Sequence, residues 1–194
     1  MKVLLADPRS AANALADRRK SGLDLYDEVW EGTYILMPLP GNPHQRIVNR
    51  LAADLTGCVE DRGLGEVFPG ANVSDDPDDW TKNYRCPDVL AFLNGNPAED
   101  RGSHWLGGPD LAVEVLSEGD LTLEKLPFYA SVGVRELWIL DRDPWRLTRH
   151  TLTGGVLKPD GATEPGGPPV RSGLLPLDWT LTAGEAPAVR VAAA

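Results

Sequence analysis

The stretch from Cys86 to Asp141 most constrains the fold of this chain, because it holds three short apolar runs typical of buried strands. A segment rich in Gly, Pro, Asn and Asp joins the first run to the second, and a helix that runs to Gly133 joins the second to the third. The runs are Pro87 to Leu93, Asp110 to Leu116 and Glu136 to Asp141. This stretch therefore predicts three buried strands, with a helix between the second and the third.

Carboxylates interrupt two of these apolar runs. Asp88 stands near the start of the first run and Glu114 near the end of the second, while Lys125 follows at or near the start of the helix. A carboxylate in a run that otherwise resembles core is costly unless it is paired, protonated or bound to a cation. Side-chain alternation places Asp110, Ala112 and Glu114 on one face of their strand. Pairing with the neighbouring strand would bring Asp88 alongside Glu114.

Two carboxylates, a backbone carbonyl and water are a good ligand set for Mg²⁺ or Mn²⁺. The alternative is structural: Asp88 caps the start of a strand, and Glu114 pairs with Lys125. Spacing alone leaves both interpretations open.

Length and composition limit the class of protein. A chain of 194 residues suits one domain, and 42% hydrophobic with 25% charged residues is usual for a soluble globular protein. No apolar run approaches the roughly 18 residues of a membrane span, and the apolar run at the start is too short for a signal peptide. Cys58 and Cys86 have no metal-site spacing, so we expect a reducing cytoplasm.

The net charge of −10 works against non-specific binding of nucleic acid, which depends on Lys and Arg. It does not exclude a nucleic-acid enzyme, because a bound divalent cation and a local basic patch would offset it.

Other patterns predict the elements around this core. The clearest is a helix from His44 to Gly63 with one apolar face. Two hairpins are expected, turned by Glu31-Gly32 and by Gly154-Gly155. We expect one domain at 23–182, a peripheral segment at 1–22 with a short helix, and a tail without a visible element at 183–194, next to an edge strand within 174–181.

The sequence contains few signs of other reaction types. The three histidines share no ligand spacing, so zinc is not expected. His44 lies at the start of the long helix, where it could also bond free backbone groups. Glu31 could be an exposed turn residue. No Walker loop or Gly-x-Ser-x-Gly elbow occurs, and no histidine is evidently placed to activate Ser117.

Several motifs occur in an order that resembles the Uma2 family, formerly the DUF820 group, bacterial proteins of unknown function grouped with restriction endonucleases. The resemblance covers roughly Tyr26 to Leu181. The motifs are Glu31-Gly32, the Pro-rich turn into His44-Gln45, Pro87-Asp88, the run from Pro109 to Ser117, Lys125 with Tyr129, and the run from Gly133 to Asp141.

The resemblance implies a branch of the PD-(D/E)XK nuclease superfamily. Its fold would be an α/β, restriction-endonuclease-like core, with a mixed central β-sheet flanked by α-helices and additional N- and C-terminal β-hairpins. The superfamily lysine usually stands two residues beyond the acid on the same strand. Leu116 occupies that place here, and Lys125 on the next helix matches the Uma2 pattern instead.

The implied mechanism is hydrolysis of phosphodiester bonds, most simply in DNA, by water activated on Mg²⁺ or Mn²⁺. Asp88, Glu114 and the Val115 carbonyl would hold the metal. Lys125 would orient the water or stabilise the charge on the phosphate. In less direct roles, Glu31 would support the metal ligands and His44 would contact phosphate or the groups behind those ligands.

The sequence leaves several alternatives open. Pro109-Asp110 is a second Pro-Asp pair, so Asp110 competes with Asp88 as the working aspartate. The alternative function is a catalytically inactive nuclease-fold protein that acts as a binding module, as the acidic charge and the displaced lysine suggest. RNA or a small phosphodiester is not separated from DNA, and a homodimer is expected only by analogy with enzymes that cut two strands.

Overall fold

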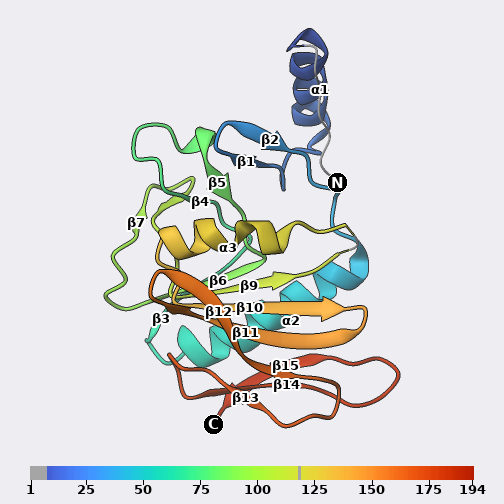
Figure 1. Ribbon diagram of the computed structural model, residues 1–194, viewed down its shortest axis with the longest axis vertical. Helices are drawn as coiled ribbons and strands as arrows, with labels where there is room; N and C mark the ends of the chain where they lie inside the picture. The colour runs from blue at the N-terminus through green and yellow to red at the C-terminus, as the bar shows by residue number, and fades with distance from the viewer. Residues whose placement is uncertain (1–7, 118) are drawn as a thin grey trace.

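The computed structural model describes residues 8–117 and 119–194 (Figure 1). Its centre is a six-stranded sheet in the order β12-β11-β10-β9-β6-β3. Strands β9 and β10 are parallel and the other neighbours antiparallel, so the sheet is mixed, as expected. The strands are β3 Gly65–Pro69, β6 Val89–Leu93, β9 Leu111–Val115, β10 Glu136–Arg142, β11 Trp145–Thr153 and β12 Val156–Thr163.

Helix α3, Thr122–Ser131, makes the crossover that two parallel strands require. It begins at Thr122, whose backbone N–H and hydroxyl both donate to the Asp120 carboxylate, at 2.7 and 2.6 Å. Lys125 therefore lies in the early part of the helix and Pro127 lies inside it, although Pro127 has no N–H to bond Leu123.

All five residues of β9 are buried, because the central sheet is covered on both faces. Leu111, Val113 and Val115 pack in one apolar cluster with helix α2, Asn42–Val59. Ala112 packs in a second cluster with Phe128 of α3. The predicted alternation of faces along this strand is confirmed.

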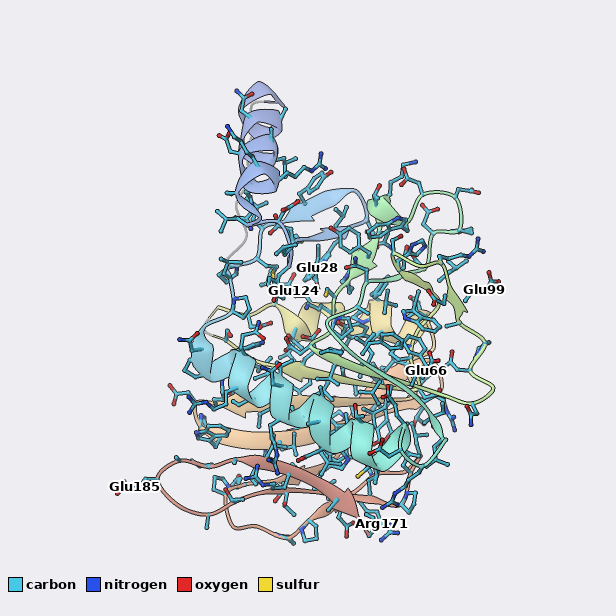
Figure 2. The ribbon with its side chains drawn as sticks, turned by 180° about the vertical axis from the view of Figure 1, so that it is seen from behind. Glu28, Glu66, Glu99, Glu124, Arg171 and Glu185 are labelled. Atoms are coloured by element: carbon cyan, nitrogen blue, oxygen red, sulfur yellow. The ribbon has the colours of Figure 1, made fainter. Side chains whose placement is uncertain are left out.

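Helix α2 buries one face, as its sequence pattern predicts, and ends at Val59, four residues before the expected Gly63. Seen from behind, it lies across the central sheet with the C-terminal strands along its side (Figure 2). These strands form a third sheet in the order β13-β14-β15. They are β13 Val170–Arg171, β14 Leu177–Leu181 and β15 Val189–Ala193.

The C-terminal residues are part of the core and not a detached tail. Strand β15 pairs with β14 along its whole length, and Val189 and Val191 are buried in the cluster that contains α2. Trp138 of the central sheet stacks on Trp179 of β14, with ring centroids 4.2 Å apart. Apolar and polar residues alternate over too few positions in β15 for the sequence to predict this strand.

The N-terminal part forms a second six-stranded sheet in the order β2-β1-β5-β4-β8-β7. Glu31 and Gly32 turn the predicted β1–β2 hairpin, both with positive φ (49° and 80°), as a two-residue hairpin loop needs. Short strands also occur in the segment expected to be a plain connection. The elements are β1 Glu28–Trp30, β2 Thr33–Ile35, β4 Val73–Ser74, β5 Tyr84–Arg85, β7 Glu99–Asp100, β8 Trp105–Leu106 and the 3₁₀ helix Trp80–Lys82.

Helix α1, Pro8–Ser21, projects from this sheet (Figure 1). Residues 1–7 of the expected N-terminal segment lie outside the described part. Arg18 ties α1 to the hairpin region, with its Nε 2.7 Å from Asp27 Oδ2. Within residues 8–117 and 119–194, no helix has the length and apolar character to span a membrane.

Candidate functional site

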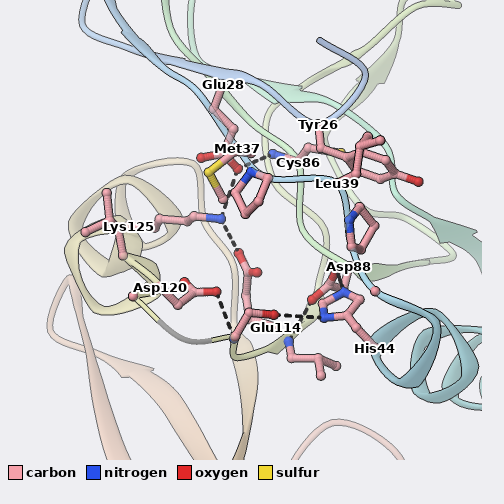
Figure 3. Close-up of a pocket in the computed structure, with 17 residues that line it drawn as sticks. Tyr26, Glu28, Met37, Leu39, His44, Cys86, Asp88, Glu114, Asp120 and Lys125 are labelled. Atoms are coloured by element: carbon pink, nitrogen blue, oxygen red, sulfur yellow. Dashed lines mark hydrogen bonds and ion pairs between the residues drawn. The ribbon is translucent and has the colours of Figure 1, made fainter. Parts of the chain in front are cut away.

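A pocket of about 300 Å³ opens where the two six-stranded sheets meet the beginnings of α2 and α3 (Figure 3). Segments far apart in the sequence supply its walls: β1, the Pro-rich turn before α2, the residues before β6, the end of β9 and the start of α3. The charged and polar side chains among them are Tyr26, Glu28, His44, Cys86, Asp88, Glu114, Ser117, Asp120 and Lys125.

Lys125 is at the centre of the charged groups. Its Nζ lies 2.9 Å from Glu28 Oε1 and 3.0 Å from Glu114 Oε1, and all three side chains are buried. Burial by itself would lower the pKa of Lys125, but the carboxylates of Glu114 and Glu28 outweigh it and raise that pKa. The ammonium therefore stays charged, and two of its three N–H donors are taken by carboxylates.

Glu114 is held by a second donor, because the buried Tyr129 hydroxyl also bonds to its Oε1. Burial raises the pKa of Glu114 to about 8, with Asp88 and Glu28 adding to the rise and Lys125 opposing it. Burial is the main cause of this high pKa, and the negative charges of Asp88 and Glu28 add to it. The pocket thus favours either a proton or a metal cation at Glu114.

Asp88 precedes β6 and accepts two hydrogen bonds. Its Oδ1 lies 2.8 Å from His44 Nε2, and its Oδ2 accepts the Val115 backbone N–H at 2.7 Å. The N–H and C=O of one strand residue point to the same edge, so the Val115 carbonyl also points toward the Asp88 side of β9. The register that pairs Val89 with Val113 places Pro87 opposite Val115, and Pro87 has no N–H to donate to that carbonyl.

These donors fit a hard divalent cation only in part. Among the described residues, no group of three or more His, Cys, Asp or Glu side chains is arranged to hold a metal ion. Mg²⁺ is usually held by one or two carboxylates and keeps several waters or takes substrate phosphate oxygens. Asp88, Glu114 and the Val115 carbonyl suit that mode of binding, whereas a closed zinc site would need four protein ligands.

Glu31 is not in this pocket. It lies exposed in the hairpin turn, where its N–H donates to Asn83, and it lines a separate pocket. Glu28, three residues earlier, takes the place expected for Glu31, with Oε1 also accepting the Cys86 N–H at 2.9 Å. Glu114 was singled out as an acidic residue in a run that resembles a buried strand. Glu28 carries the same signal, because Glu28 begins the β-rich run Glu28-Val-Trp30.

Asp110 is also outside the pocket. It lies about 13 Å from Glu114 along β9, at 3.3 Å per residue. Its carboxylate is taken up by the Leu93 N–H at 2.8 Å, the Asn96 amide at 2.8 Å and the Arg135 guanidinium at 3.0 Å. Of the two Pro-Asp pairs, the geometry brings Asp88, and not Asp110, to Glu114.

Ser117 does have a histidine neighbour, contrary to the expectation from sequence. Its Oγ lies 3.5 Å from His44 Nδ1, beyond the usual length of a hydroxyl hydrogen bond, and the other ring nitrogen faces Asp88. The two residues are 73 positions apart, so no local pattern could reveal the contact. His44 thus lies between Asp88 and Ser117 at the start of α2, and its short contact is with Asp88.

Comparison with known proteins shows which family and which solved structure this chain resembles. No curated protein matches the chain significantly. A crystal structure titled as that of a putative nuclease belonging to DUF820, from Anabaena variabilis, superposes with a TM-score of 0.61 at 18% identity, covering 75% of this chain and 80% of that one. The model of the Uma2 family, described as "Putative restriction endonuclease", matches residues 21–184. The chain, with most of its length matched and its fold shared with a DUF820 structure, belongs to the Uma2 family.

Proposed function

We propose that this protein is an endonuclease that hydrolyses phosphodiester bonds in DNA with the help of Mg²⁺ or Mn²⁺. The observation that carries the proposal is the convergence of Asp88, Glu114 and Lys125 in one pocket from three separate elements. The description of the Uma2 family supports the same reaction class.

Asp88, Glu114 and the Val115 carbonyl would hold the metal, which supplies a polarised phosphate and a water of lowered pKa when bound. Lys125 directs its remaining N–H donor to the charge that develops on the phosphate oxygens. Glu28 and Glu114 fix the position of that ammonium from opposite sides. His44 orients Asp88 from the side of α2.

The deciding experiment is a titration of Mg²⁺ and of Mn²⁺ into wild-type protein and into Asp88→Ala/Glu114→Ala by calorimetry. Cleavage of plasmid DNA is assayed on the same samples. We expect binding and cleavage in the wild type and neither in the double variant, with a cooperative melting transition retained by both proteins. Asp110→Asn is the matched control, because it removes a buried aspartate charge outside the pocket.

Cleavage that survives in the folded double variant would rule out these residues as the catalytic set. A wild type that binds no divalent cation, with or without DNA, and cuts nothing would favour the alternative of a nuclease-fold binding module. The observation behind that alternative is that Lys125 already neutralises part of the negative charge of the pocket.

A further inference from the structure

Helix α1 stands out from the body of the protein, with its last turn nearest to the N-terminal sheet (Figure 1). Arg18 fixes that turn in place. Besides its ion pair with Asp27, its Nη2 donates to the Met37 carbonyl oxygen at 2.8 Å, and Met37 lines the pocket that contains Lys125. The last turn of α1 therefore lies beside the rim of that pocket. None of the catalytic roles above involves this helix.

The charge of α1 is opposite to that of the rest of the chain. The helix holds four of the 19 basic residues and one of the 29 acidic ones, Asp17, so its net charge is +3 within a chain of −10. Arg18 is neutralised by Asp27. Arg19 and Lys20 are exposed, and neither forms an ion pair with a described residue. The last turn thus presents two unpaired positive charges.

The composition of α1 selects the kind of partner. Leu15 is the only large aliphatic residue in the helix, which has no aromatic residue. The helix therefore lacks the apolar stripe that it would need to pack against a second copy of the chain or to lie in a membrane surface. Its exposed positive charges suit the phosphate backbone of a nucleic acid, which binds Lys and Arg whatever its sequence.

The pocket itself offers little positive charge to a nucleic acid. Lys125 is the only Lys or Arg among the described residues that line it, and its ammonium is buried against the carboxylates of Glu28 and Glu114. The phosphates on either side of the one that is cleaved must therefore find cations outside the pocket. The last turn of α1 supplies two of them beside its rim.

We infer that α1 is an arm that binds the phosphate backbone of the nucleic-acid substrate through Arg19 and Lys20. The inference rests on the proposed action on nucleic acid, which supplies the ligand. Contacts of this kind position a strand at the pocket without reading its sequence. They also offset the net charge of −10, which by itself repels the substrate.

The salt dependence of DNA binding tests the arm, because each phosphate contact contributes about 0.9 to the slope of log affinity against log salt concentration. Binding of a labelled DNA duplex is measured by fluorescence anisotropy between about 50 and 200 mM salt, in EDTA so that no strand is cut. Arg19→Gln/Lys20→Gln should lower the slope by about two and weaken binding at least about tenfold. Glutamine is a good helix former, so α1 should remain helical.

Arg62→Gln/Lys158→Gln is the matched control, because it removes the same two charges from exposed residues that do not line the pocket. Arg62 follows the end of α2 that is away from the pocket. Lys158 aligns across the central sheet with Leu111, at the opposite end of β9 from Glu114. The control should bind DNA with a slope within about 0.5 of the wild-type value.

Basic residues in a last turn also interact favourably with the helix dipole, so the alternative role of Arg19 and Lys20 is structural. A lower melting temperature with an unchanged salt slope would establish that role and overturn the inference. A wild-type dimer that the Arg19→Gln/Lys20→Gln variant converts to a monomer in sedimentation would assign α1 to a second copy, with the same consequence.

The failure of this inference and that of the proposed function are distinguishable once Mg²⁺ is added to the same samples. A wild type that cuts DNA while the variant keeps the wild-type slope would overturn the arm alone. A wild type that cuts nothing, but binds DNA with a slope that falls in the variant, would support the arm and overturn the nuclease function. A wild type that binds no duplex at all would also overturn the arm.

Discussion

Lys125 and Glu28 stand 97 residues apart in the sequence, yet the Nζ and Oε1 atoms of these side chains lie 2.9 Å apart in the folded chain. Glu28 belongs to the N-terminal hairpin and Lys125 to the crossover helix of the central sheet. The ion pair therefore joins the N-terminal sheet to α3 at the pocket, and it holds the ammonium where the proposed reaction needs it.

Replacing Glu28 by Gln should weaken both roles. The amide keeps one acceptor but sets an N–H donor against the Trp30 indole N–H, which donates to Glu28 Oε2 at 2.7 Å, so we expect a loss of about 1–3 kcal/mol in the free energy of unfolding. A displaced Lys125 should lower the cleavage rate by roughly a hundredfold. Urea unfolding and single-turnover cleavage measure the two effects. Glu31→Gln, exposed three residues away, should change stability by less than about 0.5 kcal/mol, and equal losses in both variants would contradict the assignment.

Glu114 should make stability depend on pH. Its pKa is about 8 in the folded chain against an ordinary value of 4.5, so the folded state binds the proton more tightly. The contribution is complete below about pH 4.5 and is lost as pH rises through 8, with a ceiling on the order of 5 kcal/mol. Urea unfolding of wild type should show this fall between pH 5 and pH 8, and Glu114→Gln should lack it. Parallel curves for the two proteins would disprove the raised pKa.

Divalent cations should compete with that proton. If Mg²⁺ binds at Glu114, millimolar Mg²⁺ should raise the melting temperature by several degrees at pH 8 and by less at pH 6, where the carboxyl holds its proton. EDTA should reverse the increase. Glu114→Gln should show no shift at either pH. A shift of the same size in wild type and variant would place the cation elsewhere.

The two aspartates of the Pro-Asp pairs should separate function from stability. Asp110→Asn weakens the contacts with Arg135, Asn96 and the Leu93 N–H, so we expect a loss of about 1–3 kcal/mol in stability with cation binding retained. Asp88→Asn should reduce cation binding at least tenfold, because it removes a charged ligand. Calorimetric titration beside thermal melting distinguishes the two. The reverse pattern would make Asp110 the working aspartate.

Removal of β15 should destabilise the whole domain. A chain that ends before Val189 loses two buried valines and uncovers apolar surface on α2, so we expect a loss of several kilocalories per mole in urea unfolding. The single change Val191→Ala should cost about 2 kcal/mol. Arg190→Ala, on the other face of the strand, should cost much less. Unchanged stability of the shortened chain would contradict a structural role for β15.

Local patterns predicted most of the elements that build the core. Apolar runs indicated β6, β9 and β10, and the three- and four-residue spacing indicated α2, because these periodicities follow from backbone geometry alone. An acidic residue in an apolar run was enough to single out Asp88 and Glu114, since burial of an unpaired charge is costly wherever it occurs. The turn of the β1–β2 hairpin was likewise visible in Glu31-Gly32.

The full membership of the site was not visible, because the pocket is formed by segments that meet only after the sheets pack. The packing brings Glu28, and not Glu31, to Lys125. It brings Asp88, and not Asp110, into the same pocket. The third sheet depended in the same way on burial against α2, which a five-residue strand does not signal by itself. The amino-acid sequence thus determined the main strands and helices and the acidic residues they carry through local periodicity, whereas long-range packing decided which further charges join the site.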